Sequence, residues 1–167
     1  NGGGSILDLG GALPPLGQEF ETVGPVRSSS RKDFVHAVRV NRSDRVIGWY
    51  PSIVAGRSQP YHSSLELDWL RLLDVTPGVE QLKAQPRTVK VWYGGEEHHY
   101  TPDTEVVLEN GRRIIIEVKP YEYALKPKFK LVWRAIRERF ANEGTSFKIV
   151  TDRYLKVRQK TTLELQI

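Results

Sequence analysis

A short hydrophobic run directly after an Asn-Gly pair is the feature that most limits how this 167-residue chain can fold. Asn110-Gly111 is the strongest hairpin signal in the sequence, because tight hairpin turns need positive φ angles that these residue types tolerate. Residues 113–118 follow and contain Ile114-Ile115-Ile116, a pattern typical of a strand buried on both faces. The sequence therefore predicts a central strand, ended by Pro120, that a hairpin joins to the preceding segment.

Two helices are predicted, one on each side of this hairpin. The first begins at Ser63, which has capping-box spacing with Glu66, and ends at Pro77-Gly78. The second covers about residues 126–140, with Pro127 in its first turn. Apolar residues recur on one face of each helix: Leu65, Trp69, Leu72 and Leu73 in the first, and Phe129, Val132, Trp133, Ile136 and Phe140 in the second.

The remaining strands follow from alternating apolar and polar residues over 34–40 and 88–93, and a further strand is expected at 147–150; residues 98–108 are expected to be extended, with Pro102 as an interruption. Residues 46–50 are expected to pair with 34–40, and residues 51–60 to form a loop. The order of elements indicates an α/β fold with a mixed β-sheet flanked by helices. We expect four parts: an irregular arm (1–33), a hairpin and loop (34–60), a core (61–152) and a basic extension (153–167).

Composition and charge narrow the class of protein. The absence of cysteine excludes disulfides, thiol catalysis and cysteine-bound zinc. No apolar run approaches the roughly 20 residues of a membrane span, so we expect a cytoplasmic protein without membrane contact. The net charge is +5, and residues 119–139 alone hold seven basic and two acidic side chains. This local excess favours a surface that binds DNA. Trp69 and Trp133 are expected in the core, as are Trp49 and Trp92, for which stacking is the alternative.

Two carboxylates and a lysine are expected to meet beside the hairpin. Glu117 and Lys119 are two residues apart in a strand, so they point to the same face. A regular hairpin centred on Asn110-Gly111 places Asp103 almost opposite Glu117. Facing carboxylates repel unless a cation lies between them, and Mg²⁺ suits their oxygen atoms. Lys119 is then placed to position a water molecule or to stabilise charge on a phosphate.

Plainer interpretations account for the same residues. Glu117 and Lys119 could form an ordinary ion pair on a sheet face. Glu66 could complete the capping box, take part in a metal site, or do both. The basic side chains of the second helix could be a solvated face or a DNA-binding one: Lys126, Lys128, Lys130, Arg134 and Arg137.

These motifs, taken together, resemble the TnsA-like endonuclease domain of the PD-(D/E)XK nuclease superfamily. The matching residues are the stretch from His62 to Asp74, Pro77, Val79, Gln85-Pro86, Tyr100-Thr101-Pro102-Asp103 and Glu117-Val118-Lys119-Pro120. The resemblance covers about residues 60–152 and implies a restriction-endonuclease-like core over 61–152, in which Gln85 has a supporting role. The sequence departs from the family at His62, where a glutamate is common.

The resemblance also implies roles for five of the matching residues. Asp103 and Glu117 would bind Mg²⁺, which Mn²⁺ can replace, together with the backbone carbonyl of Val118. Glu66 would be the acidic residue of the helix and would reach the metal through water. Lys119 would be the catalytic lysine. The implied reaction is hydrolysis of DNA phosphodiester bonds that leaves 5′-phosphate and 3′-hydroxyl ends.

The resemblance leaves the biological setting open. As a subunit of a heteromeric transposase, the chain would cut at the 5′ ends of a transposable element beside a transposase subunit. As a phage head-completion nuclease, it would work with virion head or neck proteins and could be located in the virion; another phage or repair nuclease is also consistent. A DNA-binding assembly protein that keeps the fold without activity is the alternative from a different class. Metal-dependent cleavage separates the nucleases from this last possibility.

Overall fold

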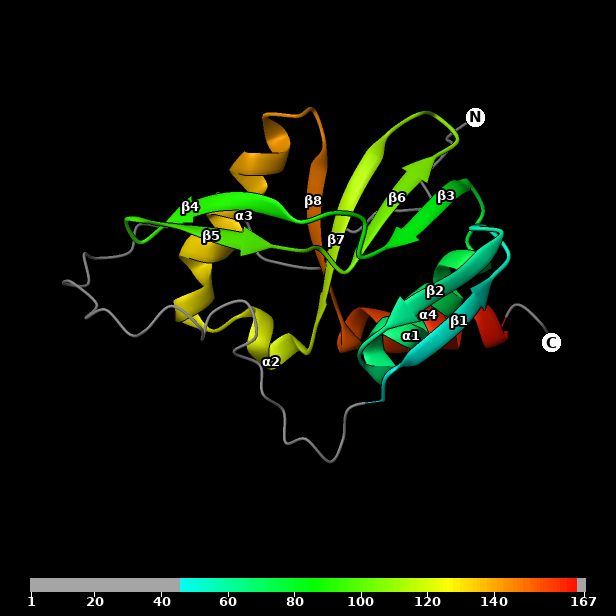
Figure 1. The fold of residues 1–167 in the computed structure, drawn as a ribbon. Helices are drawn as coiled ribbons and strands as arrows, with labels where there is room; N and C mark the ends of the chain where they lie inside the picture. The colour runs from blue at the N-terminus through cyan, green and yellow to red at the C-terminus, as the bar shows by residue number, and fades with distance from the viewer. Residues whose placement is uncertain (1–45, 165–167) are drawn as a thin grey trace, which may run out of the picture.

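A computed structural model describes residues 46–164 of the chain, and the side chains of residues 46–158. A four-stranded mixed sheet forms its centre, with the strand order β3-β6-β7-β8 (Figure 1). These strands are β3 (Val79–Ala84), β6 (Thr104–Leu108), β7 (Arg113–Lys119) and β8 (Ser146–Thr151). β6 is antiparallel to both β3 and β7, and β8 is parallel to β7. The predicted α/β fold with a mixed sheet is confirmed, although the sequence pattern did not identify β3.

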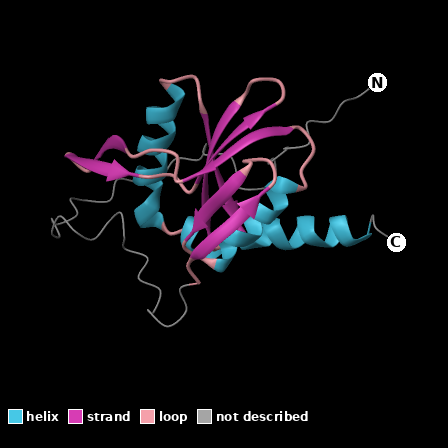
Figure 2. Cartoon of the chain, turned by 45° about the vertical axis from the view of Figure 1, so that its right-hand side comes forward, coloured by secondary structure: helices cyan, strands magenta, loops and turns pink. Residues whose placement is uncertain are grey.

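Helices cover both faces of this sheet (Figure 2). On one face, α1 (Ser64–Asp74) and α4 (Asp152–Glu164) pack over a core that includes Ile114 and Ile116. On the other, α3 (Lys130–Ala141) packs over a second core that includes Ile115. The three consecutive isoleucines of β7 are therefore buried from both sides, which confirms the predicted central strand. Each fully buried side chain of this size contributes about 1.5–3 kcal/mol to folding.

Three short segments connect β7 to β8: α2 (Tyr121–Ala124), the 3₁₀ turn η2 (Pro127–Phe129) and α3. The helix predicted over 126–140 was wrong at its start, because α3 begins at Lys130. Lys126 has an extended backbone (φ −59°, ψ 130°), as expected for a residue that precedes proline. Since β8 is parallel to β7, α3 runs back along the sheet, and its N-terminus lies at the end where β7 ends (Figure 1).

Two hairpins flank the central sheet. β1 (Gly48–Ser52) pairs with β2 (Arg57–Tyr61), and β4 (Val89–Tyr93) pairs with β5 (Glu96–Tyr100). The loop expected over 51–60 was wrong, because the chain reverses at Gly56, whose φ of 62° suits glycine, and returns as β2. The partner strand expected at 34–40 and the arm over 1–33 lie outside the described residues.

The outer faces of these hairpins correct the expectation for two tryptophans. Trp49 in β1 is 71% exposed and Trp92 in β4 is 67% exposed, whereas Trp69 and Trp133 lie in the core as expected. The physical reason is that each hairpin lies against the protein with one face only, and alternation places both tryptophans on the other face.

The chain remains part of the packed core beyond residue 152. α4 begins at Asp152, and its Leu155 is buried in the core that α1 also lines. Asp152 accepts a hydrogen bond from the backbone amide of Tyr121 at 2.8 Å, which joins the start of α4 to the start of α2. The expected boundary between a core and a basic extension therefore does not coincide with an end of the hydrophobic core. Between residues 46 and 164, no helix has the length and apolar content that crossing a membrane requires.

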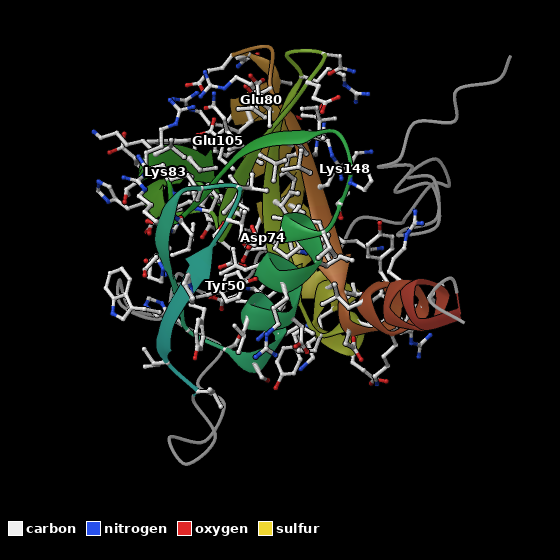
Figure 3. All side chains as sticks on the ribbon, turned by 90° about the vertical axis from the view of Figure 1, so that its right-hand side faces the viewer. Tyr50, Asp74, Glu80, Lys83, Glu105 and Lys148 are labelled. Carbon is white, nitrogen blue, oxygen red and sulfur yellow. The ribbon has the colours of Figure 1, made fainter. Side chains whose placement is uncertain are left out.

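The carboxylate of Asp74 ties the β1–β2 hairpin to the end of α1, as Figure 3 shows for Asp74 and Tyr50. It accepts hydrogen bonds from Ser52 Oγ at 2.6 Å and from the backbone amide of Ile53 at 2.9 Å. The amide of Val54 and the hydroxyl of Tyr50 donate to it as well. Burial favours the neutral carboxyl, but these hydrogen bonds outweigh it and lower the pKa of Asp74.

Replacing Asp74 by alanine should lower the free energy of unfolding at pH 7 by about 1–3 kcal/mol, because several donors lose their acceptor. The folded-state pKa is below the unfolded value, so this contribution is complete above the ordinary aspartate pKa of about 3.9 and is lost as the pH falls through the folded value. Urea unfolding at about pH 7 and pH 3 should show the difference from wild type shrinking in acid. Asp68→Ala removes only an exposed pair with Arg71 and should cost less than about 1 kcal/mol. Equal losses in the two variants would contradict the role of Asp74.

Candidate active site

The ends of β6 and β7 bring two carboxylates and a lysine together. Thr104 pairs with Ile116, so the next step along the hairpin places Asp103 beside Glu117. Lys119 Nζ lies 2.6 Å from Oε1 of Glu117 and 3.6 Å from Oδ2 of Asp103. The side chains of Asp103, Glu117 and Lys119 are 16%, 6% and 24% exposed. The structure thus brings together the three residues that the hairpin register predicted to meet.

Backbone groups of Val118 in β7 and of Gln85, directly after β3, fix Asp103. Its Oδ2 accepts a hydrogen bond from the amide of Val118 at 2.7 Å, and its own carbonyl accepts one from the amide of Gln85 at 2.9 Å. The N–H and C=O of one strand residue point to the same edge, so the carbonyl of Val118 is on the Asp103 side of β7. Asp103 is therefore held between the end of β3 and the end of β7.

The charges in this group depend strongly on one another. Burial and the neighbouring charge of Glu117 raise the pKa of Asp103 well above its ordinary value, although the Lys119 ammonium opposes the shift. Burial disfavours the charged form of Lys119, but the carboxylates of Glu117 and Asp103 outweigh it and raise the pKa of Lys119 above its ordinary value. Lys119 is therefore a cation at neutral pH, and it lies where two like charges need one.

The chemistry of the donors fits a hard divalent cation. Asp103, Glu117 and the Val118 carbonyl offer oxygen atoms, and oxygen is the ligand that Mg²⁺ prefers. Within the described part of the chain, no group of three or more histidine or acidic side chains is placed to hold a metal ion. A cation here would therefore rely on two carboxylates, one carbonyl and water, and Mg²⁺ usually keeps several waters.

Glu66 caps α1. Its Oε2 accepts a hydrogen bond from the amide of His62 at 2.8 Å, and its Oε1 accepts one from Ser63 Oγ at 2.9 Å. Ser63 Oγ accepts in turn from the amide of Glu66 at 3.1 Å, so the predicted capping box is confirmed. The charge of Glu66 contributes to the raised pKa of both Asp103 and Lys119. Both oxygens of Glu66 thus contact groups at the start of α1, and its charge lies close enough to influence Asp103 and Lys119.

Gln85 adopts a strained backbone beside Asp103. Its φ of 46° is positive, a conformation that side chains other than glycine adopt infrequently. Its side-chain amide lies 3.0 Å from Nδ1 of His62, just before α1. Gln85 thus connects the end of β3 to both Asp103 and the start of α1, and strain of this kind concentrates at functional sites.

Three of the basic residues predicted to bind DNA lie at the same end of the sheet as the site, and two lie further away along α3. Because α2 follows β7 directly, Lys126, Lys128 and Lys130 are at the end of the sheet that holds Asp103. Arg134 and Arg137 lie further along α3, towards the opposite end of the sheet. Arg134 also pairs with Glu138 at 2.9 Å, which neutralises part of its charge.

Sequence reasoning gave no role to Tyr100, which the structure places in direct contact with the site. Its hydroxyl donates a hydrogen bond of 2.5 Å to Oε2 of Glu117. The available signal was its position three residues before Asp103, on the inward side of the strand that leads to it. The contact itself depends on a residue from another sheet, which strand alternation does not reveal.

Comparison with known proteins agrees with the nuclease-like arrangement of Asp103, Glu117 and Lys119. A family model described as TnsA-like endonuclease N terminal matches residues 43–152. The match covers more than half of the chain and contains Glu66, Asp103, Glu117 and Lys119. None of the curated proteins searched matches the chain significantly. The domain is of the restriction-endonuclease-like fold, in agreement with the mixed sheet between two helical layers. The chain therefore belongs to the TnsA-like endonuclease N-terminal domain family.

Proposed function

We propose that this chain is a Mg²⁺-dependent endonuclease that hydrolyses phosphodiester bonds in DNA. The observation that carries the proposal is the meeting of Asp103, Glu117 and Lys119 at the ends of β6 and β7, in a chain of an endonuclease family. Two like charges that converge in a largely buried position cost stability. A protein that only bound DNA would gain nothing from that cost, whereas a nuclease needs these carboxylates for its metal.

The residues of the site divide the chemistry among them. Asp103 and Glu117 would hold the metal, together with the Val118 carbonyl. When bound, Mg²⁺ supplies stabilisation of phosphate charge and lowers the pKa of a water molecule. Lys119, protonated at neutral pH, donates from its ammonium to the phosphate or to the attacking water, and so stabilises negative charge. Glu66 adds negative charge nearby and holds the start of α1 in place.

Plasmid nicking tests the proposal. The wild-type protein should nick supercoiled plasmid with Mg²⁺ or Mn²⁺ and not with EDTA, and Asp103→Ala should be inactive. Calorimetric titration with Mn²⁺ should show binding to the wild type and none to Asp103→Ala. The titration matters because a nuclease that needs a partner would bind the metal without nicking. A wild type that neither nicks nor binds Mn²⁺ would contradict the proposal and favour a DNA-binding assembly protein.

The DNA should lie across the start of α3, because Lys126, Lys128 and Lys130 are at the same end of the sheet as the site. Lys128→Ala should weaken binding to DNA of any sequence and reduce the slope of log K against log [salt] by about 1, because one phosphate contact is lost. Arg112→Ala is the matched control, since Arg112 is exposed in the β6–β7 turn at the opposite end of the sheet. It should leave the slope unchanged. Binding titrations with a labelled duplex at several salt concentrations measure both, and equal slopes for the two variants would argue against this surface.

The setting that the family favours is transposition. In that setting the chain would cut at the 5′ ends of a transposable element, and a transposase subunit would supply recognition of the DNA site. Support comes from the family match, whose description names a TnsA-like endonuclease. Co-purification with a transposase would support this setting, and recovery with virion head or neck proteins would support a phage head-completion nuclease instead.

A further inference from the structure

We propose that Tyr100 is a positioning residue that orients the Glu117 carboxylate for metal binding; the inference rests on the proposed nuclease function. The two oxygens of Glu117 have separate partners. Oε2 accepts the hydrogen bond from the Tyr100 hydroxyl at 2.5 Å, and Oε1 lies 2.6 Å from Lys119 Nζ. A hydroxyl that donates to a carboxylate at this distance makes a strong, charge-assisted hydrogen bond. Tyr100 therefore fixes the orientation of the Glu117 carboxylate, with one oxygen on the Tyr100 hydroxyl and the other facing Lys119.

Packing away from the site holds the Tyr100 ring. Tyr100 is the last residue of β5 and pairs with Val89 of β4. Its ring meets the ring of Phe140 in α3 edge to face, with centroids 6.4 Å apart. It also packs against the second core, which α3 and β8 line. The ring is thus held on the side away from the hydroxyl by packing contacts from β4 and α3, as a preorganised site requires.

The loss of this hydroxyl would change the carboxylate more than the fold. The Glu117 side chain is only 6% exposed, so water cannot readily replace the donor at Oε2. Without it, the carboxylate is free to turn both oxygens towards the Lys119 ammonium, which then competes more strongly with a metal. Partners that orient a metal ligand in this way are worth about 10–100-fold in metal affinity or activity.

Calorimetric titration with Mn²⁺ tests the inference on the full chain. Tyr100→Phe should weaken Mn²⁺ binding by about 10–100-fold relative to wild type. Tyr50→Phe is the matched control, because it removes a hydroxyl that donates to another carboxylate, Asp74, at the far end of α1 from Glu66. It should leave the Mn²⁺ affinity unchanged. In nicking assays, a higher Mn²⁺ concentration should restore the activity of Tyr100→Phe while its KM for DNA stays at the wild-type value.

The outcomes separate this inference from the proposed function. If the wild type binds Mn²⁺ and Tyr100→Phe binds it equally well, the positioning role is wrong and the nuclease proposal stands. If the wild type neither binds Mn²⁺ nor nicks DNA, both are wrong. A lowered melting temperature in Tyr100→Phe with unchanged Mn²⁺ affinity would show a structural role only, and would overturn the inference.

A second measurement keeps the hydroxyl and avoids a variant that fails to fold. With 3-fluorotyrosine placed at position 100, the fluorine resonance should shift on addition of Mg²⁺, because the hydroxyl contacts a ligand of the metal. With 3-fluorotyrosine at position 50, the resonance should stay in place. A resonance at position 100 that does not respond to Mg²⁺, in a protein that calorimetry shows to bind it, would overturn the inference.

Discussion

Lys119→Ala should reduce DNA nicking by about 10²–10³-fold and should also destabilise the metal-free protein. The activity falls because the ammonium that stabilises charge at the phosphate is gone. The stability falls because Asp103 and Glu117 then face each other without a cation, and removing one partner of a buried ion pair costs about 3–5 kcal/mol. Because the ammonium no longer competes for the carboxylates, the variant should bind Mn²⁺ more tightly than wild type, and saturating Mn²⁺ should recover much of its stability. Plasmid nicking, urea unfolding and calorimetry measure the three effects.

Lys90→Ala is the matched control for this prediction. Lys90 also forms an ion pair, 2.9 Å from Glu97, but both side chains are exposed on the β4–β5 hairpin. Its loss should cost less than about 1 kcal/mol and leave Mn²⁺ affinity unchanged. A Lys119→Ala protein that keeps wild-type nicking, or whose stability does not respond to Mn²⁺, would show that Lys119 has no part in the site.

Asp103→Asn should abolish activity and, in the absence of metal, make the protein more stable than wild type. Burial and the charge of Glu117 raise the folded-state pKa of Asp103 above its unfolded value, so its ionised form opposes folding at neutral pH. The amide removes this cost, and its oxygen can still accept the hydrogen bond from Val118. We expect a gain of about 0.5–2 kcal/mol, typical of substitutions that relieve a functional site. The loss of a metal ligand should lower nicking by about 10³-fold or more.

Glu105→Gln provides the comparison on the same strand. Glu105 forms an ion pair with Arg113 at 2.5 Å. Removing the charge of Glu105 should therefore lower the free energy of unfolding slightly and leave nicking intact. The wild type should also gain stability from mild acidification near the folded-state pKa of Asp103, and Asp103→Asn should lose that part of the response. Urea unfolding across this pH range measures both. An Asp103→Asn protein that is less stable than wild type would show that the ionised carboxylate supports the fold.

Local patterns predicted the parts of the site that adjoin the hairpin. The Asn110-Gly111 pair predicted the hairpin of β6 and β7, and the observed register, one residue from a turn centred between those two residues, places Asp103 beside Glu117. The spacing of Ser63 and Glu66 predicted the capping box that starts α1. In both cases, the interacting groups are close in sequence or joined by one tight turn, so backbone geometry alone decides the contact.

Contacts between distant segments were beyond the sequence pattern. The hydrogen bond from Tyr100 to Glu117 joins a hairpin to the central sheet, and the contact from Gln85 to His62 joins the end of β3 to the start of α1. The exposure of Trp49 and Trp92 depends on which face of each hairpin meets the protein. The start of α3 is a case between these two. Pro127 was evident in the sequence, but the extended backbone that it imposes on Lys126 delayed the helix that the apolar pattern predicted from residue 126.

By itself, the sequence determined the central strand, the hairpin and the residue types of the site. Hydrophobic period, turn chemistry and charge act over a few residues, so they can be interpreted without knowing the fold. Only the tertiary structure decided that Lys119 pairs with two largely buried carboxylates. It also decided that an oxygen of Glu66 accepts a hydrogen bond at the start of α1 and that the Tyr100 hydroxyl donates to Glu117. Those arrangements set the pKa of Asp103 and Lys119, because burial and the distances between charges exist only once the sheets and helices have packed.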